Sequence, residues 1–341
     1  MNIIGFNSML EASFGKLALS SNSLLNSIRI KHENNWYLVG EACKNLGKNP
    51  HRLVNSRPEE VDYQVLLLAS LLMSSTGSSD RISLTLGFPF STYNSFKSAA
   101  EKILSVKNFV IEYDTSLFKK DPSIEKKSIE IENLEIVPEL AGCAIALKKH
   151  LKVPETNFLL VSVGFGTIEI GMVTADGLNQ RTIISVPGIV RCIQNLRVEL
   201  EKEHFIGFIN DHQLDEAFKK GSLVLNRSNV NIKNLRSNII KSFYREYISD
   251  TIRAMISDRD FERMEKIYVC GGGAYYEEIR DSFKNEFEKV LPVEILNEPD
   301  TLAAIGYYHN SIRFINSSST GTPVGIDIGN SSTWIVKSEV E

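Results

Sequence analysis

The sequence predicts an α/β protein built from two domains. The chain has 341 residues, enough for two domains of roughly 150 residues each. Both halves mix strand-like and helix-like segments, as α/β domains do. Each half also carries a glycine-bearing turn between two strands, around Gly164 and around Gly329. These two turns are therefore the first candidates for a binding site.

The composition is that of an ordinary globular protein, with 43% hydrophobic and 23% charged residues. The net charge of −4 argues against broad, sequence-independent binding to nucleic acid, so we expect no direct nucleic-acid contact. The longest apolar run, Val65–Met73, is too short to cross a bilayer, and the N-terminal segment lacks the basic region and cleavage site of a secretory signal. We expect a cytoplasmic protein without a membrane segment. The cysteines lack paired spacing, which favours buried free thiols over zinc or disulfides at positions 43, 143, 192 and 270.

In the first half, apolar patterning predicts strands and helices in alternation. Expected strands cover residues 27–31, 36–39, 82–87, 108–113, 127–131 and 134–137, and expected helices cover 58–74, 93–104 and 139–151. In the second half, expected strands cover 158–163, 167–174, 178–185, 267–270 and 293–295. Expected helical regions cover 188–205, most of 211–257, 275–287 and 300–313. Residues 316–323 have the composition of a flexible linker, and 324–337 again form strand, turn and strand.

The turn near the C-terminus, Asp327–Thr333, is a candidate phosphate site. It joins two strands and has no Gly-Lys-Ser/Thr, which excludes a Walker A loop. Backbone N–H groups and hydroxyls of small polar residues can form a nest for phosphate oxygens. Asp327, just before the turn, is placed to hold a hydrated Mg²⁺. A plain hairpin is the alternative interpretation.

Two further turns support this interpretation. Val161–Glu169 is again a glycine turn between strands, and two such hairpins can clamp a polyphosphate from both sides. Gly271–Gly273 close a buried strand and open a helix, where a flat purine and ribose can lie against the backbone. Taken singly, each turn is also consistent with an ordinary hairpin or loop.

Together these motifs resemble the signature set of the actin superfamily, which includes actin, the plasmid-segregating ParM proteins, MreB, the large heat-shock chaperone ATPases and sugar kinases. Five segments carry the resemblance over essentially the whole chain: the two phosphate motifs, the two connecting motifs and the adenosine motif, at Asp327–Thr333, Ser162–Glu169, Pro138–Ala146, Leu302–Tyr307 and Val269–Ala274. The resemblance implies two actin-like (ribonuclease H-like) domains around a nucleotide cleft. These comprise 1–151 with 301–341, including a small lobe at about 21–75, and 152–300, including a small lobe at about 190–260.

The order of the motifs is rotated relative to the family. The first phosphate motif, which opens the protein in the family, here follows the second connecting motif and the segment 316–323. The N-terminal segment resembles the part of ParM-like proteins that follows their first phosphate motif. Phe6-Asn7-Ser8 resembles their Phe-Pro-Ser, and Trp36–Ala42 resembles a later strand of the same proteins. This is the arrangement of a circular permutant with 316–323 as its linker, and joining nearby termini costs little.

The resemblance also implies roles for individual residues. Asp327, helped by Glu169, would hold Mg²⁺ through water, and Glu139 would orient the water that attacks ATP or GTP. The phosphates would be held by Gly329, Asn330, Ser331, Ser332, Ser162, Gly164, Phe165, Gly166 and Thr167. The nucleoside would lie against Gly271, Gly272, Gly273 and Ala274.

Two positions depart from the family pattern. Ser162 stands where the family has an aspartate, and a neutral hydroxyl cannot balance a cation or act as a base. Trp334 stands where many members have a phosphate-contacting lysine, and Lys337 comes too late to replace it. We therefore expect nucleotide binding with slow or impaired hydrolysis.

The function implied by the resemblance is a cytoskeletal filament protein of the ParM type, serving plasmid or DNA segregation with a DNA-binding adaptor as its partner. Two alternatives stay open: a nucleotide-dependent switch or adaptor that does not polymerise, and a small-molecule kinase. A kinase usually needs a longer chain and an aspartate for the acceptor hydroxyl, and the sequence offers no clear candidate for that aspartate. Neither end of the chain reads as an amphipathic membrane anchor.

Overall fold

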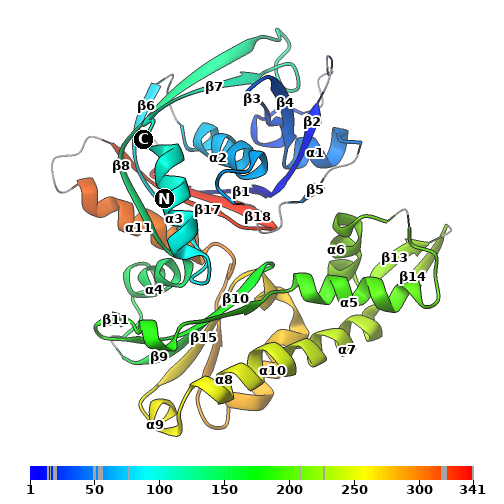
Figure 1. Ribbon diagram of the computed structural model, residues 1–341, viewed down its shortest axis with the longest axis vertical. Helices are drawn as coiled ribbons and strands as arrows, with labels where there is room; N and C mark the ends of the chain where they lie inside the picture. Colours follow the sequence, from blue (N-terminus) through cyan, green and yellow to red (C-terminus); the bar gives the residue numbers. More distant parts are fainter. Residues whose placement is uncertain are drawn as a thin grey trace. The chain divides into compact units, whose positions relative to one another are not determined.

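The computed structural model describes residues 1–13, 15, 17, 21–48, 51–52, 57–75, 77, 79–154, 156–207, 209–225, 227–315 and 321–339. The chain divides into two compact units. Unit 1 combines Met1–Val153 with Thr301–Glu341, and unit 2 is Pro154–Asp300. Each unit mixes strands with helices (Figure 1), which confirms the predicted α/β class.

Unit 1 is organised around a ten-stranded sheet in the order β1-β18-β17-β6-β8-β7-β3-β4-β2-β5. Its strands are β1 Asn2–Asn7, β2 Met9–Ser13, β3 Arg29–His32, β4 Asn35–Val39, β5 His51–Arg52, β6 Ser79–Phe88, β7 Asn108–Asp114, β8 Ile124–Pro138, β17 Thr322–Ile328 and β18 Ser332–Lys337. Its α-helices are α1 Glu41–Leu46, α2 Val61–Ser74, α3 Tyr93–Leu104, α4 Glu139–Lys149 and α11 Leu302–Ile315.

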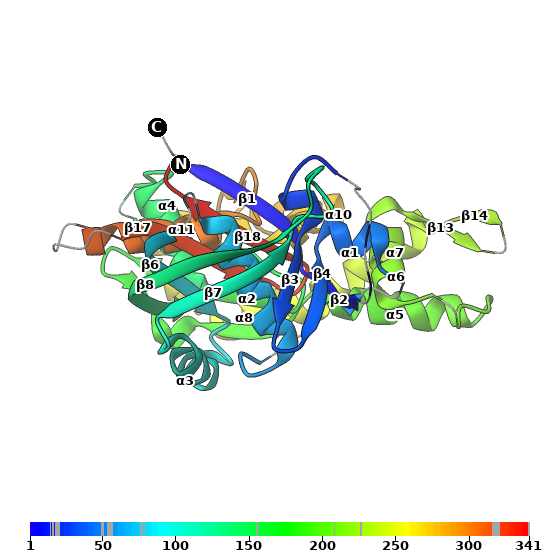
Figure 2. The same ribbon diagram turned by 90° about the horizontal axis from the view of Figure 1, so that it is seen from above.

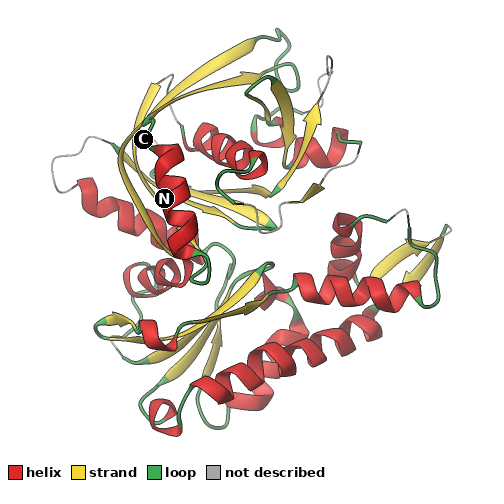
Figure 3. Ribbon diagram, in the orientation of Figure 1, coloured by secondary structure: helices red, strands yellow, loops and turns green. Residues whose placement is uncertain are grey.

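The sheet of unit 1 curves around helix α2 (Figure 3). Nine of the fourteen residues of α2 are buried, which explains why its sequence is apolar nearly all round. The helix contacts β17 and β18 as well as β2, β3 and β4, so one helix supports both ends of the sheet. Helices α4 and α11 pack against each other, and α11 also contacts β17 and β6.

The N-terminal strand of unit 1 pairs with its C-terminal strand. β1 runs antiparallel to β18, from Asn2 opposite Lys337 to Asn7 opposite Ser332 (Figures 1 and 2). The amino group of Met1 lies 3.2 Å from a carboxylate oxygen of Glu339. The two ends of the described chain are therefore neighbours, with the hairpin β17–β18 inserted between β1 and β6.

Unit 2 contains a six-stranded sheet and a separate two-stranded hairpin. The larger sheet has the order β11-β10-β9-β15-β16, with β12 also paired to β10. Its strands are β9 Phe158–Val163, β10 Thr167–Thr174, β11 Gly177–Leu178, β12 Ile184–Pro187, β15 Lys266–Cys270 and β16 Val293–Ile295. The hairpin is β13 Ser222–Leu225 with β14 Ser228–Asn231, and the α-helices are α5 Val190–Glu201, α6 Asp211–Lys220, α7 Lys233–Phe243, α8 Asp250–Met255, α9 Asp258–Phe261 and α10 Glu277–Phe287.

The main strands of the two units follow one pattern. In unit 2, β12, β10 and β9 are antiparallel neighbours, and β9, β15 and β16 are parallel neighbours. In unit 1, β1, β18 and β17 are antiparallel neighbours, and β17, β6 and β8 are parallel neighbours. In unit 2 these five strands follow one another along the chain as β9, β10, β12, β15 and β16. In unit 1 the strands at the matching positions are β17, β18, β1, β6 and β8, so the first two of them come last in the chain.

Several local predictions need correction. The expected helical region 211–257 is interrupted by the hairpin Ser222–Asn231, which follows a left-handed Gly221 at the end of α6. The two strands expected at 127–131 and 134–137 are one strand, β8, of 15 residues. Of the predicted linker 316–323, residues 316–320 lie outside the described part, while Thr322 and Pro323 already belong to β17.

Two expectations concern cysteines and membrane segments. All four cysteines are buried free thiols, as predicted. Among the described residues, every helix is too short or too polar to span a bilayer.

Candidate functional site

The hairpin between β17 and β18 contains the predicted phosphate residues of unit 1. Asp327 lies opposite Trp334 in the ladder, and the N–H of Gly329 donates to the carbonyl of Ser332 at 3.0 Å to close the turn. A Cβ at Gly329 would lie 2.8 Å from that same carbonyl oxygen. The turn is therefore so tight that this position needs glycine.

The sheet brings Glu139 to the same edge as this hairpin. In register, Ile326 lies opposite Leu86, and Leu86 lies opposite Ile136, so β17, β6 and β8 end at one edge. Glu139 is the first residue of α4, directly after β8. With β6 between them, β17 and β8 are about 10 Å apart, so Asp327 and Glu139 lie near the same edge of the sheet on two different strand ends.

Tyr63, in the first turn of α2, is close to this hairpin and was not predicted. Its side chain is buried, and its ring packs against Phe88 at the end of β6 with centroids 5.7 Å apart. Burial raises the pKa of the Tyr63 hydroxyl, and the charge of Asp327 raises it further. The tyrosine therefore stays neutral beside the carboxylate that we expect to hold Mg²⁺.

Ser8 supports the hairpin from the end of β1. Its N–H donates to the carbonyl of Ser331 at 3.0 Å, and its Oγ donates to the carbonyl of Gly329 at 2.5 Å. The same Oγ lies 2.8 Å from Oγ1 of Thr333, and both side chains are fully buried. Because a serine hydroxyl has one hydrogen, Thr333 must be the donor in that contact.

The hairpin between β9 and β10 in unit 2 is built in the same way. The N–H of Gly164 donates to the carbonyl of Thr167 at 2.9 Å, and a Cβ at Gly164 would lie 2.5 Å from that oxygen. Three backbone N–H groups support the turn from the segment after β12. Gly188 donates to Gly166 at 2.9 Å, Ile189 to Gly164 at 3.2 Å and Val190 to Phe165 at 2.8 Å.

Two predicted residues of this hairpin lie deeper than its turn. Ser162 is 3% exposed and lies opposite Glu169 in the ladder. Glu169 is fully buried in β10, and its Oε1 accepts a hydrogen bond from Ser185 at 2.8 Å. The Glu169 carboxylate is thus held inside the sheet, and its part in binding Mg²⁺ through water stays a prediction.

The glycine turn after β15 touches the same hairpin. Cys270 lies opposite Ser162 between two parallel strands. A Cβ at Gly273 would lie 2.3 Å from the Val163 side chain, and Gly271 has a left-handed φ of 82°. Both glycines are therefore needed for the close approach, so unit 2 places Gly164–Thr167 next to Gly271–Ala274.

Three residues that were not predicted lie around the glycine turn and extend the face formed by Gly164–Thr167 and Gly271–Ala274. The hydroxyl of Tyr275 donates to Oδ1 of Asp300 at 2.8 Å, and Asp300 lies over Gly272. Burial raises the pKa of Asp300, while the hydrogen bond from Tyr275 and the charge of Lys219 act in the opposite direction. Lys219 itself pairs with the buried Asp215 at 2.9 Å. The face combines an aromatic ring, a carboxylate and an ammonium group beside the exposed Gly272.

A sequence signal existed for only some of these residues. Tyr275 directly follows the predicted nucleoside segment Gly271–Ala274, and Asp300 lies two positions before the predicted connecting motif Leu302–Tyr307, so both lie near predicted motifs. Lys219 lies 52 positions before Gly271 and belongs to a charged helix that looks like an ordinary solvated surface.

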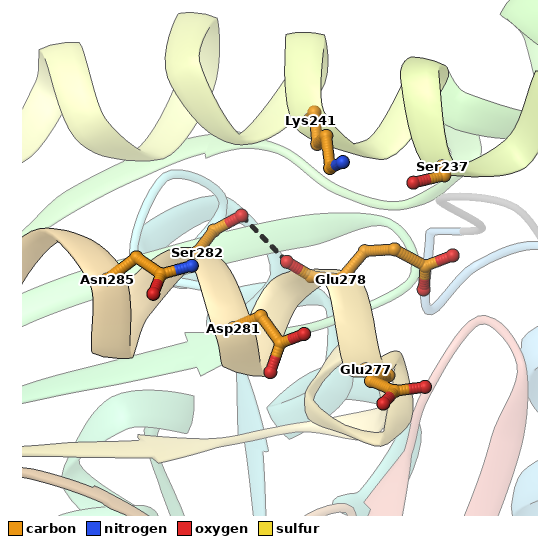
Figure 4. Close-up of a pocket in the computed structure, with 7 residues that line it drawn as sticks. All are labelled: Ser237, Lys241, Glu277, Glu278, Asp281, Ser282 and Asn285. Atoms are coloured by element: carbon orange, nitrogen blue, oxygen red, sulfur yellow. Dashed lines mark hydrogen bonds between the residues drawn. The ribbon is translucent and has the colours of Figure 1, made fainter. Parts of the chain in front are cut away.

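A polar pocket of about 330 Å³ opens between α7 and α10 in unit 2 (Figure 4). Its lining residues are Ser237, Lys241, Glu277, Glu278, Asp281, Ser282 and Asn285. Glu278 also pairs with Arg236 at 3.0 Å, and that arginine donates to the carbonyl of Lys219 at 3.2 Å. The predicted nucleotide residues do not line this pocket, which instead adjoins the ion pair that holds α6, α7 and α10 together.

Comparison with known proteins identifies the fold. Residues 6–142 match the family model described as the actin like proteins N terminal domain. An archaeal actin homologue, Ta0583, matches with a TM-score of 0.72 at 17% identity, covering 90% of this chain and 92% of its own. The same homologue in complex with ADP gives a TM-score of 0.67 at 17% identity, with 92% of each chain covered.

A ParM protein is similar to the same extent. The protein of a 15-stranded ParM filament from Clostridium botulinum matches with a TM-score of 0.72 at 17% identity, covering 91% of this chain and 93% of its own. Comparison with curated protein sequences gave no match. The resemblance inferred from the turns is confirmed at the level of fold: this chain has the actin-like fold, and its residues 6–142 are similar to the N-terminal domain of actin like proteins.

Proposed function

We propose that this chain binds a nucleoside triphosphate with Mg²⁺ through its two hairpins and its glycine turn. One observation carries the proposal: each unit has a hairpin whose first glycine would place a Cβ within 2.8 Å of the carbonyl three residues later. Two independent sets of strands thus keep the same tight turn with glycine at its first position, and turns of this kind can present backbone N–H groups to a phosphate. The ADP complex of Ta0583, which has the same fold, supports the choice of ligand.

The residues have separable roles in this proposal. Asp327 holds Mg²⁺ through water, in keeping with the preference of this ion for few protein ligands and several waters. Glu139 orients the attacking water from the end of β8. Ser162, buried and neutral, supplies no second negative charge, so hydrolysis is slow. The nucleoside lies on the face formed by Gly271–Ala274, Tyr275 and Asp300, and the nucleotide is ATP or GTP.

Binding and turnover of ATP test these roles separately. Asp327→Asn should weaken Mg²⁺-dependent ATP binding about tenfold or more, while Asp176→Asn, at an exposed turn of unit 2, serves as the matched control. Glu139→Gln should abolish phosphate release without loss of binding, and Ser162→Asp should accelerate it. Unchanged ATP affinity in Asp327→Asn would refute the proposed site. Rapid ATP turnover by the unmodified chain would refute the proposed slow hydrolysis.

We also propose that the chain self-associates into filaments. Support comes from the ParM filament of Clostridium botulinum, whose subunit has the same fold. Plasmid or DNA segregation through a DNA-binding adaptor is the cellular role that suits such a filament. Sedimentation with ATP, with ADP and without nucleotide, followed by electron microscopy of the pellet, tests this. Protein that stays monomeric under all three conditions contradicts filament formation and favours a nucleotide-dependent switch.

We further infer that the chain is a circular permutant. The matching strand patterns of the two units support this. The strands of unit 1 have the same order along the chain as those of unit 2 only if β17 and β18 are placed before β1. The adjacency of Met1 and Glu339 supports it as well, since such neighbours can be joined by a short connection.

A further inference from the structure

We propose that Ser8 is a positioning residue for the phosphate hairpin Gly329–Thr333, an inference that rests on the proposed nucleotide binding. Ser8 lies between β1 and β2, and its neighbours in the hairpin are more than 320 positions away in sequence. It makes one backbone and two side-chain hydrogen bonds to Ser331, Gly329 and Thr333. These bonds attach the turn to β1 as well as to the two strands that it joins.

Unit 2 provides an internal comparison for this arrangement. There, the carbonyl of Gly164 accepts a hydrogen bond from the N–H of Ile189, and the carbonyl of Gly166 accepts one from Gly188. In unit 1 the matching carbonyls belong to Gly329 and Ser331. The N–H of Ser8 takes the place of the Gly188 N–H, and the Ser8 hydroxyl takes the place of the Ile189 N–H.

Unit 1 uses a side-chain hydroxyl where unit 2 uses a backbone amide. The support of its hairpin therefore depends on one side chain. A backbone N–H is present with any residue but proline at position 189, whereas the bond to Gly329 depends on a side-chain hydroxyl at position 8. The environment is dry, because Ser8 and Thr333 are both fully buried. Without the Ser8 hydroxyl, both the Gly329 carbonyl and the Thr333 hydroxyl lose this partner.

Thr333 extends the same support. Its hydroxyl donates to Ser8 Oγ and so orients the serine hydrogen toward Gly329. The corresponding position of unit 2 is Ile168, which is fully buried and has no hydroxyl. The hydroxyl pair therefore belongs to the hairpin of unit 1 alone, where Asp327 and the proposed phosphate residues lie.

The experiment compares Ser8→Ala with Ser27→Ala in the full chain. Ser27 is an apt control because it is equally buried, but its hydroxyl has no hydrogen-bond partner within the described part of the chain. Ser8→Ala should weaken binding of ATP with Mg²⁺ about tenfold, as expected for loss of a buried hydrogen bond that orders the ligand loop. It should also speed hydrogen exchange at the amides of 329–333, and Ser27→Ala should leave both properties unchanged.

A double-mutant cycle separates positioning from general destabilisation. Thr333→Val should weaken ATP binding less than Ser8→Ala does, and the double variant should resemble Ser8→Ala because the two hydroxyls act as one unit. A role in overall stability alone would lower the melting temperature but leave the ATP affinity of the folded protein unchanged. Should Ser8→Ala yield no folded protein, Thr333→Val carries the same comparison.

The outcomes distinguish this inference from the function on which it rests. If the unmodified chain binds no nucleotide, the proposed function fails, and hydrogen exchange at 329–333 still decides whether Ser8 orders the turn. If the unmodified chain binds ATP, and Ser8→Ala binds it equally well with unchanged exchange, the positioning role is overturned while the proposed function stands.

Discussion

The carbonyl oxygen of Gly142 in helix α4 lies 1.8 Å from the place that a Cβ would occupy at Gly306 in helix α11. The two helices therefore cross backbone against backbone, with no room for a methyl group. We expect Gly306→Ala to destabilise the protein by about 1–3 kcal/mol, the usual cost of overpacking a close contact. Thermal or denaturant unfolding without nucleotide measures this.

Gly272→Ala is the matched control for that measurement. A Cβ at Gly272 would meet only the Cβ of Asp300, at an ordinary 3.9 Å. Its unfolding free energy should stay close to that of the unmodified chain. Equal effects of the two substitutions would show that the crossing of α4 and α11 tolerates a methyl group.

A second prediction concerns Lys337, which is buried at the end of β18. Its Nζ donates to the carbonyls of Met73 and Ser75 at 2.9 and 3.1 Å, at the C-terminal end of α2. Lys337→Met removes both bonds and should cost about 1–3 kcal/mol of unfolding free energy at neutral pH, because buried carbonyls lose a charged donor. Lys102→Met, at an exposed position of α3 in the same unit, is the control.

Burial also gives Lys337 a defined pH signature. Burial lowers the pKa of Lys337 below 10.5, with the nearby charge of Asp80 acting in the opposite direction. Between the lowered pKa and 10.5, the unfolded chain binds more protons at this site than the folded chain, so this site adds stability as pH rises. The stability of the unmodified chain relative to Lys337→Met should therefore increase toward pH 10.5. A flat difference would contradict this.

A third prediction concerns base recognition in unit 2. Because Tyr275 is held by Asp300 beside the glycine turn, Tyr275→Phe should weaken ATP binding several-fold, about 1 kcal/mol for one hydrogen bond. Binding of inorganic tripolyphosphate, which has no base, should not change. Loss of the hydrogen bond should also raise the pKa of Asp300 further, measurable by carboxyl titration in an NMR experiment.

Tyr308→Phe is the control for this change, because its hydroxyl lies 3.2 Å from Ser338 Oγ in unit 1. If Tyr275→Phe weakens ATP and tripolyphosphate equally, Tyr275 acts on the phosphate hairpin and not on the nucleoside.

A fourth prediction tests the permutation. A chain in which 321–341 precede Met1 through a short glycine–serine connection, and which ends at Ile315, should fold and unfold with nearly unchanged stability. The reason is that the new connection spans the short gap between Met1 and Glu339, while strands β17, β18 and β1 keep their neighbours. Circular dichroism and thermal unfolding measure the outcome, and an unfolded product would contradict the inferred permutation.

The sequence predicted features that local patterns encode. Gly164, Gly271 and Gly329 all lie at strand ends, because glycine between apolar strands marks a tight turn. The hairpin of β13 and β14 was missed because it is short and lies between two charged helices. Within its two strands, only Leu223 and Leu225 are buried. The charged helices on either side gave this part of the sequence a helical pattern, although it forms a hairpin in the folded chain.

The support of the site could not be predicted for a different reason. Ser8 acts on Gly329 through a bond that spans 321 positions, and a lone serine after a strand carries no signal of its partner. Lys337 was considered only as a substitute for a phosphate contact, whereas the structure uses its charge to satisfy the end of α2. Such roles depend on which segments meet in three dimensions.

The pairing of β1 with β18 has a consequence for synthesis of the protein. Strand β1 is synthesised before unit 2 and its partner β18 after it, since Asn2 pairs with Lys337. Unit 2, by contrast, is one continuous stretch, Pro154–Asp300. Nascent chains fold domain by domain as complete domains emerge. The later-made unit 2 can thus finish folding during translation, while the nascent β1 still exposes an unpaired edge that chaperones would have to shield.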